Sequence, residues 1–192
     1  EKILVIISAM GKTTNALEKV VDAFFEGRKD DALQLFNQVK DQHLNMLKYL
    51  TTLHWQQAEL HLKDFFTEIE WLLHDKPVRE YDYYYDQIVC SGELLSTSMM
   101  SDYLGEIGVT NKWIDVRDID WAFTQQKVKD IIEPVFDCCN VIITQGFIGA
   151  TDENESTTLG REGSDYSAAI FANLLNAESQ TIWKDVEGVM NA

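Results

Sequence analysis

Apolar runs and apolar helical stripes alternate along the chain and predict a protein of the α/β class. Runs rich in β-branched residues predict strands over 3–7 (ILVII), 113–116 (WIDV) and 140–144 (NVIIT), and a further strand is predicted over 181–183. The run at 3–7 is apolar throughout, which is typical of a strand buried on both faces of a parallel sheet. Strands that alternate with helices indicate a three-layer α/β/α sandwich around a mostly parallel sheet.

Apolar residues at helical spacing fill the segments between these strands. Helices are predicted over 15–26, 82–107, 125–138 and from the glycine turn near 160 to about 176, with a polar loop or hairpin over 148–158. The stretch 30–74 lacks Gly and Pro, and its leucines and aromatics recur at helical spacing, so it predicts two or three helices. A compact α/β unit does not need so long a helical stretch, so we interpret about 30–80 as a helical insertion.

Composition and charge narrow the class of protein. The 192 residues, 45% of them hydrophobic, suffice for one domain with a full core. A net charge of −16 disfavours non-specific binding to nucleic acid or to an anionic membrane. The longest apolar run is too short to cross a bilayer, and Cys90, Cys138 and Cys139 form no disulfide or zinc pattern. We therefore expect a cytoplasmic protein that binds neither nucleic acid nor membrane.

Four turns are expected to meet at one edge of the sheet, because ligands of open α/β sheets bind beyond the carboxyl ends of the strands. Three of them, SAMGKTTN, TQGF and KDVEGV, follow predicted strands, and the fourth, TLGREGSDYSAA, opens the last long helix. SAMGKTT is not a P-loop, because position 6, where that motif requires a glycine, is Ile6. The four turns together predict a site for an anionic ligand.

The fourth turn carries the most specific pattern. Gly160 and Gly163 allow a tight turn, and Ser164 is predicted to cap the helix that follows. A helix N-terminus attracts anions, and Arg161 adds a guanidinium group that pairs with carboxylate or phosphate. By spacing alone, two simpler interpretations stay open: Arg161 as a surface residue, and Asp165 as a complement to the helix dipole.

Glu93 is the only carboxylate in an otherwise small and apolar phrase, CSGELLST (90–97). A buried carboxylate needs a partner such as an ammonium group. The spacing alone leaves this interpretation open beside that of an exposed helix glutamate.

Six phrases, in this order, resemble the aspartokinases of the amino acid kinase family. They are ISAMGKTTNAL (7–17), SGELLST (91–97), WIDVRD (113–118), VIITQGFIGA (141–150), TTLGREGSDYSAA (157–169) and IWKDVEGVMNA (182–192). The resemblance covers both ends and the middle of the chain. It implies a three-layer sandwich around a mostly parallel sheet. It also implies that ATP phosphorylates the side-chain carboxylate of L-aspartate to 4-phospho-L-aspartate, the first step of lysine, threonine and methionine biosynthesis.

The resemblance also implies roles for individual residues. Asp165 matches the aspartate that organises the catalytic centre. Glu93 matches the glutamate that holds the α-ammonium group of the substrate, and Arg161 matches the arginine that pairs with its α-carboxylate. The other matches are Ser8, Thr14 and Ser164 in the substrate site, and Lys184, Asp185, Gly188 and Val189 in the nucleotide-binding loop. The family also implies Mg²⁺ held mainly by the nucleotide, with no protein ligand assigned, and a homodimer.

Three departures from the family pattern indicate that residues 1–192 are an excerpt of a catalytic domain. No Lys-Phe-Gly-Gly phrase precedes Ile3, and the join at 117–120 is shorter than in aspartokinases. The rest of the nucleotide site and the C-terminal ACT regulatory domains, expected after Ala192, are absent. We therefore expect little kinase activity from the excerpt alone, because it lacks cationic groups that stabilise transition-state charge.

Other functions remain open beside this one. A kinase for another small carboxylate substrate is the nearest, although the phrases GELLST and GREGSDY favour aspartate. A non-catalytic amino-acid-binding module is an alternative from another class. A weaker alternative is an oligomerisation module built from the helices of 30–74, with Tyr83, Tyr84 and Tyr85 at an interface.

Overall fold

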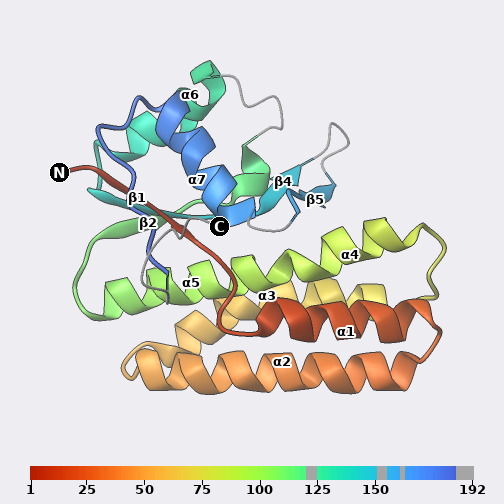
Figure 1. Ribbon diagram of the computed structural model, residues 1–192. Coiled ribbons are helices and arrows are strands. Elements are labelled where there is room, and N and C mark those ends of the chain that lie inside the picture. The colour runs from red at the N-terminus through yellow and green to blue at the C-terminus, as the bar shows by residue number, and fades with distance from the viewer. Residues whose placement is uncertain (120–124, 151–154, 161–162, 185–192) are drawn as a thin grey trace.

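A parallel sheet positions the rest of the chain (Figure 1). The computed structural model describes residues 1–119, 125–150, 155–160 and 163–184. The strands β1 (Ile3–Ile7), β3 (Val141–Gln145) and β2 (Asn111–Trp113) form one sheet in the order β1-β3-β2. Both pairings are parallel, so the carboxyl ends of the strands lie at one edge. A short antiparallel hairpin, β4 (Ile148–Ala150) and β5 (Ser156–Thr158), follows β3.

Helices cover both faces of the sheet. Figure 1 shows α5 (Ser91–Glu106) against one face, and α6 (Gln125–Val135) and α7 (Gly163–Leu174) over the other. Four more helices pack around α5 on its far side: α1 (Thr13–Phe25), α2 (Lys29–Leu50), α3 (Trp55–His74) and α4 (Tyr81–Val89). The predicted three-layer α/β/α sandwich is confirmed, with a helical layer added beyond α5.

Two clusters of buried apolar side chains hold these layers together. The first joins Leu94 of α5 and Ile142 of β3 to Phe171 of α7, each at most 1% exposed. The second lies among α1 to α5, and its members include Leu17, Phe36, Leu62, Tyr84 and Leu95. Because α5 contributes to both clusters, it links the sheet to the helical layer.

The helical predictions hold, with shifted bounds. The stretch 30–74 forms two helices, α2 and α3, and the loop or hairpin predicted over 148–158 contains the strands β4 and β5. The single helix predicted over 82–107 is two helices, α4 and α5, that meet at Cys90. That 30–80 is an insertion relative to other family members stays a prediction.

The strand predicted over 113–116 is wrong in position, because β2 ends at Trp113. The Ile114 N–H still donates to the carbonyl of Ile143 on β3 (2.9 Å), but two side chains accept backbone N–H groups beyond it. The Val116 N–H donates to the side-chain oxygen of Gln145 (2.8 Å), and the Arg117 N–H donates to the carboxylate of Asp115 (2.9 Å). These bonds begin a 3₁₀ turn, η1 (Val116–Asp118).

The strand predicted over 181–183 is also wrong. Residues 181–184 have no strand structure and are exposed, with Trp183 89% exposed. Residues 181–183 line a cavity beside β1 instead of pairing with that strand. For the same reason β1 is not buried on both faces: Ile3 is 44% exposed, and β3 is the only strand paired with β1 in the described part of the chain.

We expect the two leucines of α3 to differ sharply when truncated. Leu62 is fully buried in the helical core, whereas Leu60, two residues earlier, is 60% exposed. Leu62→Ala should lower the free energy of unfolding by about 2–5 kcal/mol, because it leaves a cavity. Leu60→Ala should change it by about 0.5 kcal/mol or less. Urea denaturation of both variants measures the difference, and equal effects would contradict this packing of α3.

Candidate functional site

The turn after β1 lies directly on the first turn of α5. Gly11 has a φ of +57°, and α1 begins two residues later at Thr13, whose hydroxyl donates to the carbonyl of Met10 (2.6 Å). On the facing helix, a Cβ added to Gly92 would lie 3.0 Å from the Cβ of Ala9 and 3.3 Å from the Thr13 side chain. Glycine at position 92 therefore lets α5 approach this turn closely.

Glu93 follows Gly92 and is buried, with 4% of its surface exposed. Its Oε1 accepts the backbone N–H of Ala9 (3.2 Å), whereas its Oε2 has no hydrogen-bond partner. Burial raises the pKa of the Glu93 carboxyl from 4.5 to about 7, although the Ala9 hydrogen bond acts in the opposite direction. Of the two interpretations that the spacing left open, the structure supports the buried carboxylate.

The unpaired Glu93 oxygen is unusual within the described residues. The imidazole Nε2 of His43 is the other buried side-chain atom there that lacks a partner. A buried polar group without a hydrogen bond costs about 1–3 kcal/mol. Glu93 Oε2 is thus a buried acceptor, in a carboxylate that becomes charged near neutral pH, and a cationic donor would satisfy it.

Two glycines hold the start of α7 against the end of β3. A Cβ added to Gly146 would lie 2.6 Å from the Cα of Ser164, so only glycine fits between the two segments. A Cβ added to Gly163 would lie 2.9 Å from the ring of Phe147. The hydroxyl of Ser167 completes this junction by accepting the Phe147 N–H (3.0 Å). This contact confirms the prediction that the turns TQGF and TLGREGSDYSAA meet at one edge of the sheet, although the close packing of Gly146 on Ser164 was not predicted.

The prediction that Ser164 caps α7 is wrong, because the helix already begins at Gly163. Ser164 lies within the first helical turn, where the close contact with Gly146 fixes its backbone. Its neighbour Asp165 forms an ion pair with a residue beyond α7: the ammonium group of Lys184 lies 2.6 Å from its carboxylate. The structure therefore brings together two of the predicted site residues, Asp165 and Lys184.

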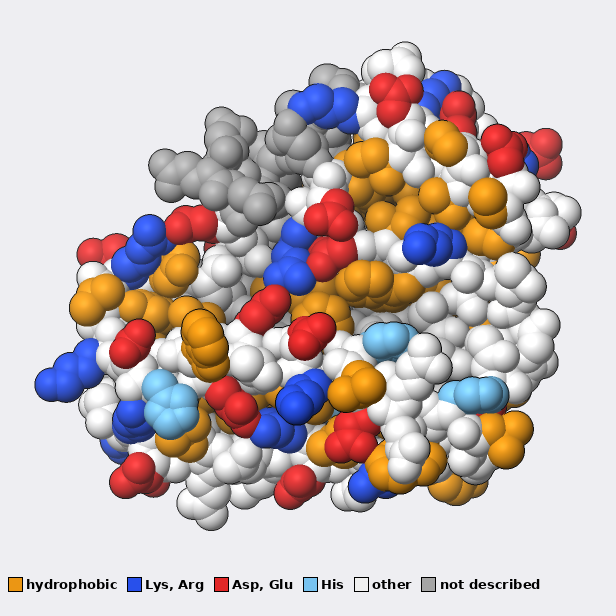
Figure 2. All heavy atoms as spheres, turned by 180° about the vertical axis from the view of Figure 1, so that it is seen from behind, with side chains coloured by type: hydrophobic (Ala, Val, Ile, Leu, Met, Phe, Trp, Pro, Cys, Tyr) orange, Lys and Arg blue, Asp and Glu red, His pale blue; other side chains and the backbone are white. Residues whose placement is uncertain are grey.

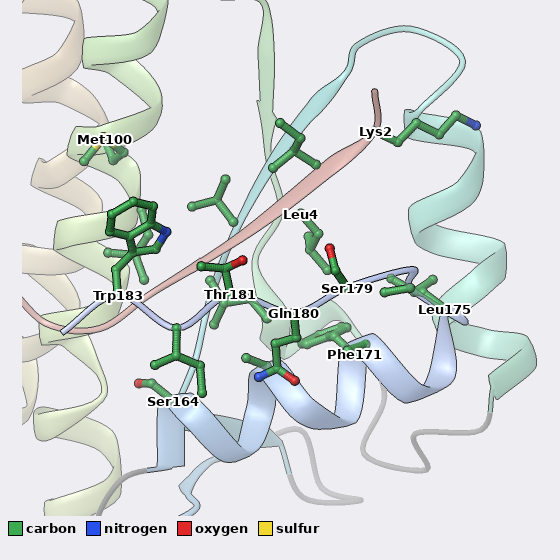
Figure 3. A pocket seen from close by; sticks show the side chains of 18 of the residues that line it. Lys2, Leu4, Met100, Ser164, Phe171, Leu175, Ser179, Gln180, Thr181 and Trp183 are labelled. Carbon is green, nitrogen blue, oxygen red and sulfur yellow. The ribbon is translucent and has the colours of Figure 1, made fainter. Parts of the chain in front are cut away.

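A cavity of about 1650 Å³ runs beside β1 and collects several of these groups. Ser8, Ser164 and Asp165 line it, together with apolar side chains of α7. Figure 3 shows Leu4 of β1, Phe171 of α7 and Thr181 around this space. The cavity extends along β1 and α7, and Ser8, Ser164 and Asp165 lie where β1 ends and α7 begins, at the edge where the sequence predicted a site for an anion.

The predicted site residues divide into three groups. Ser8, Ser164 and Asp165 share the cavity, and Lys184 pairs with Asp165. Glu93 and Thr14 lie at the turn after β1, Thr14 half-buried in the first turn of α1 and Glu93 hydrogen-bonded to Ala9. Arg161, Asp185, Gly188 and Val189 lie outside the described residues.

Sequence reasoning missed two buried polar residues near the site, Thr97 and Gln145. Both are fully buried, and they are hydrogen-bonded to each other. Gln145 is the last residue of β3, after Thr144, and Thr97 is one helical turn after Glu93. Their positions could have identified them from the sequence, because a polar residue at a strand end or on a buried helix usually has a specific hydrogen-bond partner.

Charge is dispersed over the surface. Figure 2 shows acidic side chains scattered among basic ones over one face of the molecule. Within the part of the chain that the structure describes, no helix is long and apolar enough to cross a membrane. The same residues contain no group of three or more His, Cys, Asp or Glu side chains placed to hold a metal ion.

Known proteins with similar sequences are aspartokinases. The chain is 30% identical to the chloroplastic bifunctional aspartokinase/homoserine dehydrogenase 1 of Zea mays, over all of this chain and 22% of that protein. It is 30% identical to the lysine-sensitive aspartokinase 3 of Escherichia coli, over 97% of this chain and 43% of that protein. The chain thus spans less than half the length of these relatives.

The fold comparison agrees with the sequence comparison. The crystal structure of E. coli aspartokinase III in complex with lysine and aspartate matches 97% of this chain with a TM-score of 0.85 and 28% identity. The matched region is 43% of the chain in that crystal structure. A second structure of the same enzyme, in complex with aspartate and ADP, matches 91% of this chain with a TM-score of 0.79 and 27% identity. The amino acid kinase family matches residues 1–192 in full, and the chain therefore belongs to that family.

Proposed function

We propose that this chain is part of an aspartokinase, which transfers the γ-phosphoryl group of ATP to the side-chain carboxylate of L-aspartate. The observation that carries the proposal is the buried carboxylate of Glu93 with its unpaired Oε2, placed at the carboxyl ends of the strands. The α-ammonium group of an amino acid would supply the missing donor and the opposite charge. Relatives named aspartokinases, and a similar fold that holds aspartate and ADP, support this assignment.

Substrate recognition would use both ends of the amino acid backbone. Glu93 would bind the α-ammonium group. Arg161, which lies outside the described residues, would pair with the α-carboxylate. Ser8, Thr14 and Ser164 would line the same site. Because this clamp engages only the backbone groups, the side-chain carboxylate of the substrate stays free to react. A site that hydrogen-bonds a substrate group rejects analogues that lack it by large factors.

Phosphoryl transfer would then depend on position and charge. The side-chain carboxylate of aspartate is ionised at neutral pH, so no general base is needed. One of its oxygens forms a bond to the γ-phosphorus while the bond to the β–γ bridging oxygen breaks, and ADP leaves. Asp165 would organise this centre, and its ion pair with Lys184 holds an ammonium group at the cavity wall. Such fixed charges stabilise the transition state without reorganising.

The nucleotide would bind at the chain's C-terminal loop. Lys184, Asp185, Gly188 and Val189 would form this site, of which the structure describes Lys184. Mg²⁺ would neutralise phosphate charge, and the phosphate oxygens of the nucleotide would hold it, since Mg²⁺ prefers oxygen ligands. In the whole protein we propose a homodimer that performs the first step of lysine, threonine and methionine biosynthesis.

The substrate assignment predicts that Glu93→Gln loses affinity for L-aspartate. The amide keeps the shape of the side chain but removes the charge that would pair with the ammonium group. Calorimetric titration should show a dissociation constant at least about tenfold larger, because hydrogen bonds to charged groups contribute about 1.5–3 kcal/mol. Glu106→Gln is the matched control, since Glu106 ends the same helix about 20 Å away.

The outcomes of this titration separate the candidate functions. Tight binding of L-aspartate over L-glutamate, lost in Glu93→Gln and kept in Glu106→Gln, supports the proposal. Stronger binding of another small carboxylate would indicate that this carboxylate, and not L-aspartate, is the substrate. Release of ADP from ATP, measured with L-aspartate on the full-length protein, distinguishes a kinase from a binding module. Equal affinity of wild type and Glu93→Gln would contradict the role of Glu93.

The raised pKa of Glu93 predicts a pH-dependent stability. Because folding raises this pKa from 4.5 to about 7, the folded state is favoured while Glu93 is protonated. That stabilisation is complete below about pH 4.5 and is lost as the pH rises to about 7. Wild type should lose about 3 kcal/mol of unfolding free energy over this range relative to Glu93→Gln. Parallel denaturation curves that keep a constant difference would show that Glu93 titrates normally.

A further inference from the structure

Two neighbouring hydroxyl groups fasten α5 to the ends of the strands. The hydroxyl of Ser96 donates to the carbonyl of Ser8, just beyond β1 (2.8 Å). The hydroxyl of Thr97 donates to the carbonyl of Glu93, one helical turn earlier (2.8 Å). The side chain of Thr97 thus reaches the backbone of the residue whose carboxylate faces the proposed substrate.

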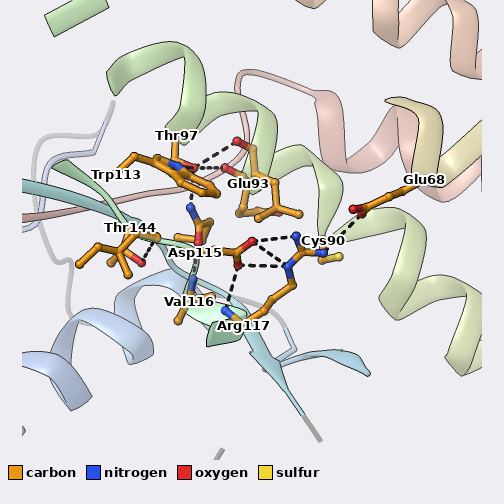
Figure 4. Close-up of polar contacts among 12 residues, drawn as sticks. Glu68, Cys90, Glu93, Thr97, Trp113, Asp115, Val116, Arg117 and Thr144 are labelled. Atoms are coloured by element: carbon orange, nitrogen blue, oxygen red, sulfur yellow. Dashed lines mark hydrogen bonds and ion pairs between the residues drawn. The ribbon is translucent and has the colours of Figure 1, made fainter. Parts of the chain in front are cut away.

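The Thr97 hydroxyl also accepts two hydrogen bonds from the sheet. Its donors are the side-chain amide of Gln145, at the end of β3 (2.7 Å), and the indole N–H of Trp113, at the end of β2 (2.9 Å). One donated and two accepted bonds saturate a hydroxyl group. Figure 4 shows Thr97 between Glu93 and Trp113.

Gln145 is bonded at both ends of its side chain. The amide nitrogen donates to Thr97, and the amide oxygen accepts the backbone N–H of Val116 (2.8 Å). Gln145 is fully buried, so neither group can exchange its partner for water without local opening. The next residue is Gly146, which contacts Ser164. The same backbone segment therefore contacts the first turn of α7 and, through Gln145, the helix of Glu93.

We propose that Gln145 and Thr97 are positioning residues that fix the carboxylate of Glu93 against the strand ends and thereby set the affinity for the amino acid substrate. The affinity part rests on the proposed function, and the positioning part concerns the free protein. Neither side chain needs to touch the substrate. They act because a helix turn held at its carbonyl by Thr97, and through Thr97 by β3, cannot rotate or slide as a unit.

The free protein contains its own reporter of this position. The backbone N–H of Ala9 donates to Oε1 of Glu93 (3.2 Å), so its NMR resonance depends on where the carboxylate lies and on its protonation. Movement of the first turn of α5 would lengthen this bond. The Ala9 amide resonance, followed against pH, therefore reads out the Glu93 carboxylate without any ligand.

The test compares isosteric variants. Thr97→Val and Gln145→Met remove the hydrogen bonds but keep the side-chain volume. Thr144→Val is the matched control: Thr144 is fully buried on β3, and its hydroxyl donates to the carbonyl of Ile114 (3.0 Å) instead of to a residue of α5. Thr97→Ser keeps the hydroxyl and should retain the wild-type Ala9 titration and aspartate affinity. Each variant is measured by urea denaturation, by the Ala9 amide titration and by calorimetric titration of L-aspartate.

We expect Thr97→Val and Gln145→Met to shift the Ala9 amide resonance and its titration midpoint, and to weaken L-aspartate binding about five- to tenfold. The double variant should bind L-aspartate no more weakly than the single variant with the larger effect, because both substitutions act through one contact. Thr144→Val should lose comparable stability while leaving the Ala9 resonance, its midpoint and the aspartate affinity unchanged. Thr97→Ser should match wild type in the Ala9 titration and the aspartate affinity, and should lose only the stability that a deleted buried methyl group contributes.

Two results would overturn the positioning role. One is an unchanged Ala9 titration in both Thr97→Val and Gln145→Met. The other is a Thr144→Val variant that disturbs Ala9 and aspartate binding as strongly, since the effect would then be general loss of packing. A different result would contradict only the substrate assignment: the wild-type protein does not bind L-aspartate, but Thr97→Val and Gln145→Met still shift the Ala9 resonance. The positioning role would then be supported without that substrate.

Discussion

The attachment of α5 to the carboxyl ends of the strands is the constraint on which the site depends. Nine successive residues, Ser91–Met99, are buried, so the helix has no solvent-facing side over that length. Five of them carry polar side chains, and burial without partners would be costly for each. Hydrogen bonds from Ser96 to the carbonyl of Ser8, just beyond β1, and from Gln145 to Thr97 supply partners for two of the five. The same bonds fix the helix relative to the sheet, and therefore fix Glu93.

Glu93 shows why such a fastening is needed. A buried carboxylate with one unpaired oxygen destabilises the fold as its pKa is passed, so a loosely held helix would turn it toward water. Here the neighbours on both sides oppose that movement, because Gly92 packs on Ala9 and Thr97 is held by Gln145. The unpaired oxygen of Glu93 lowers the stability of the free protein, and a bound cationic group would restore that stability. If Glu93 binds the substrate's ammonium group as proposed, the site is preorganised for that group, and the cost of the unpaired oxygen falls on folding.

The sequence predicts the layers of this fold better than the details of its site. The runs at 3–7 and 140–144 lie within one residue of β1 and β3, because continuous β-branched stretches between helical segments have few alternatives. The strand expected over 181–183 has the same local preference, yet it pairs with no neighbour in the described residues. Pairing is a non-local property, and local composition does not contain it. The burial of Glu93 could be suggested, but Gln145 was overlooked because its partners are 29 and 48 residues away.

Glycine illustrates the same division between local and non-local causes. The pattern drew attention to Gly160 and Gly163 as turn formers, and Gly160 does have a positive φ of 76°. The glycines that bring the site together act differently. Gly92 lies inside a helix, where glycine costs about 1 kcal/mol relative to alanine, and Gly146 directly follows a strand; neither has a positive φ. A Cβ at Gly146 would lie 2.6 Å from the Cα of Ser164, and a Cβ at Gly92 would lie 3.0 Å from the Cβ of Ala9, so a distant segment limits the space at each position. A glycine without a positive φ has a backbone conformation that any residue could adopt. Such a glycine therefore indicates, more strongly than a turn glycine does, that two distant segments meet at its position.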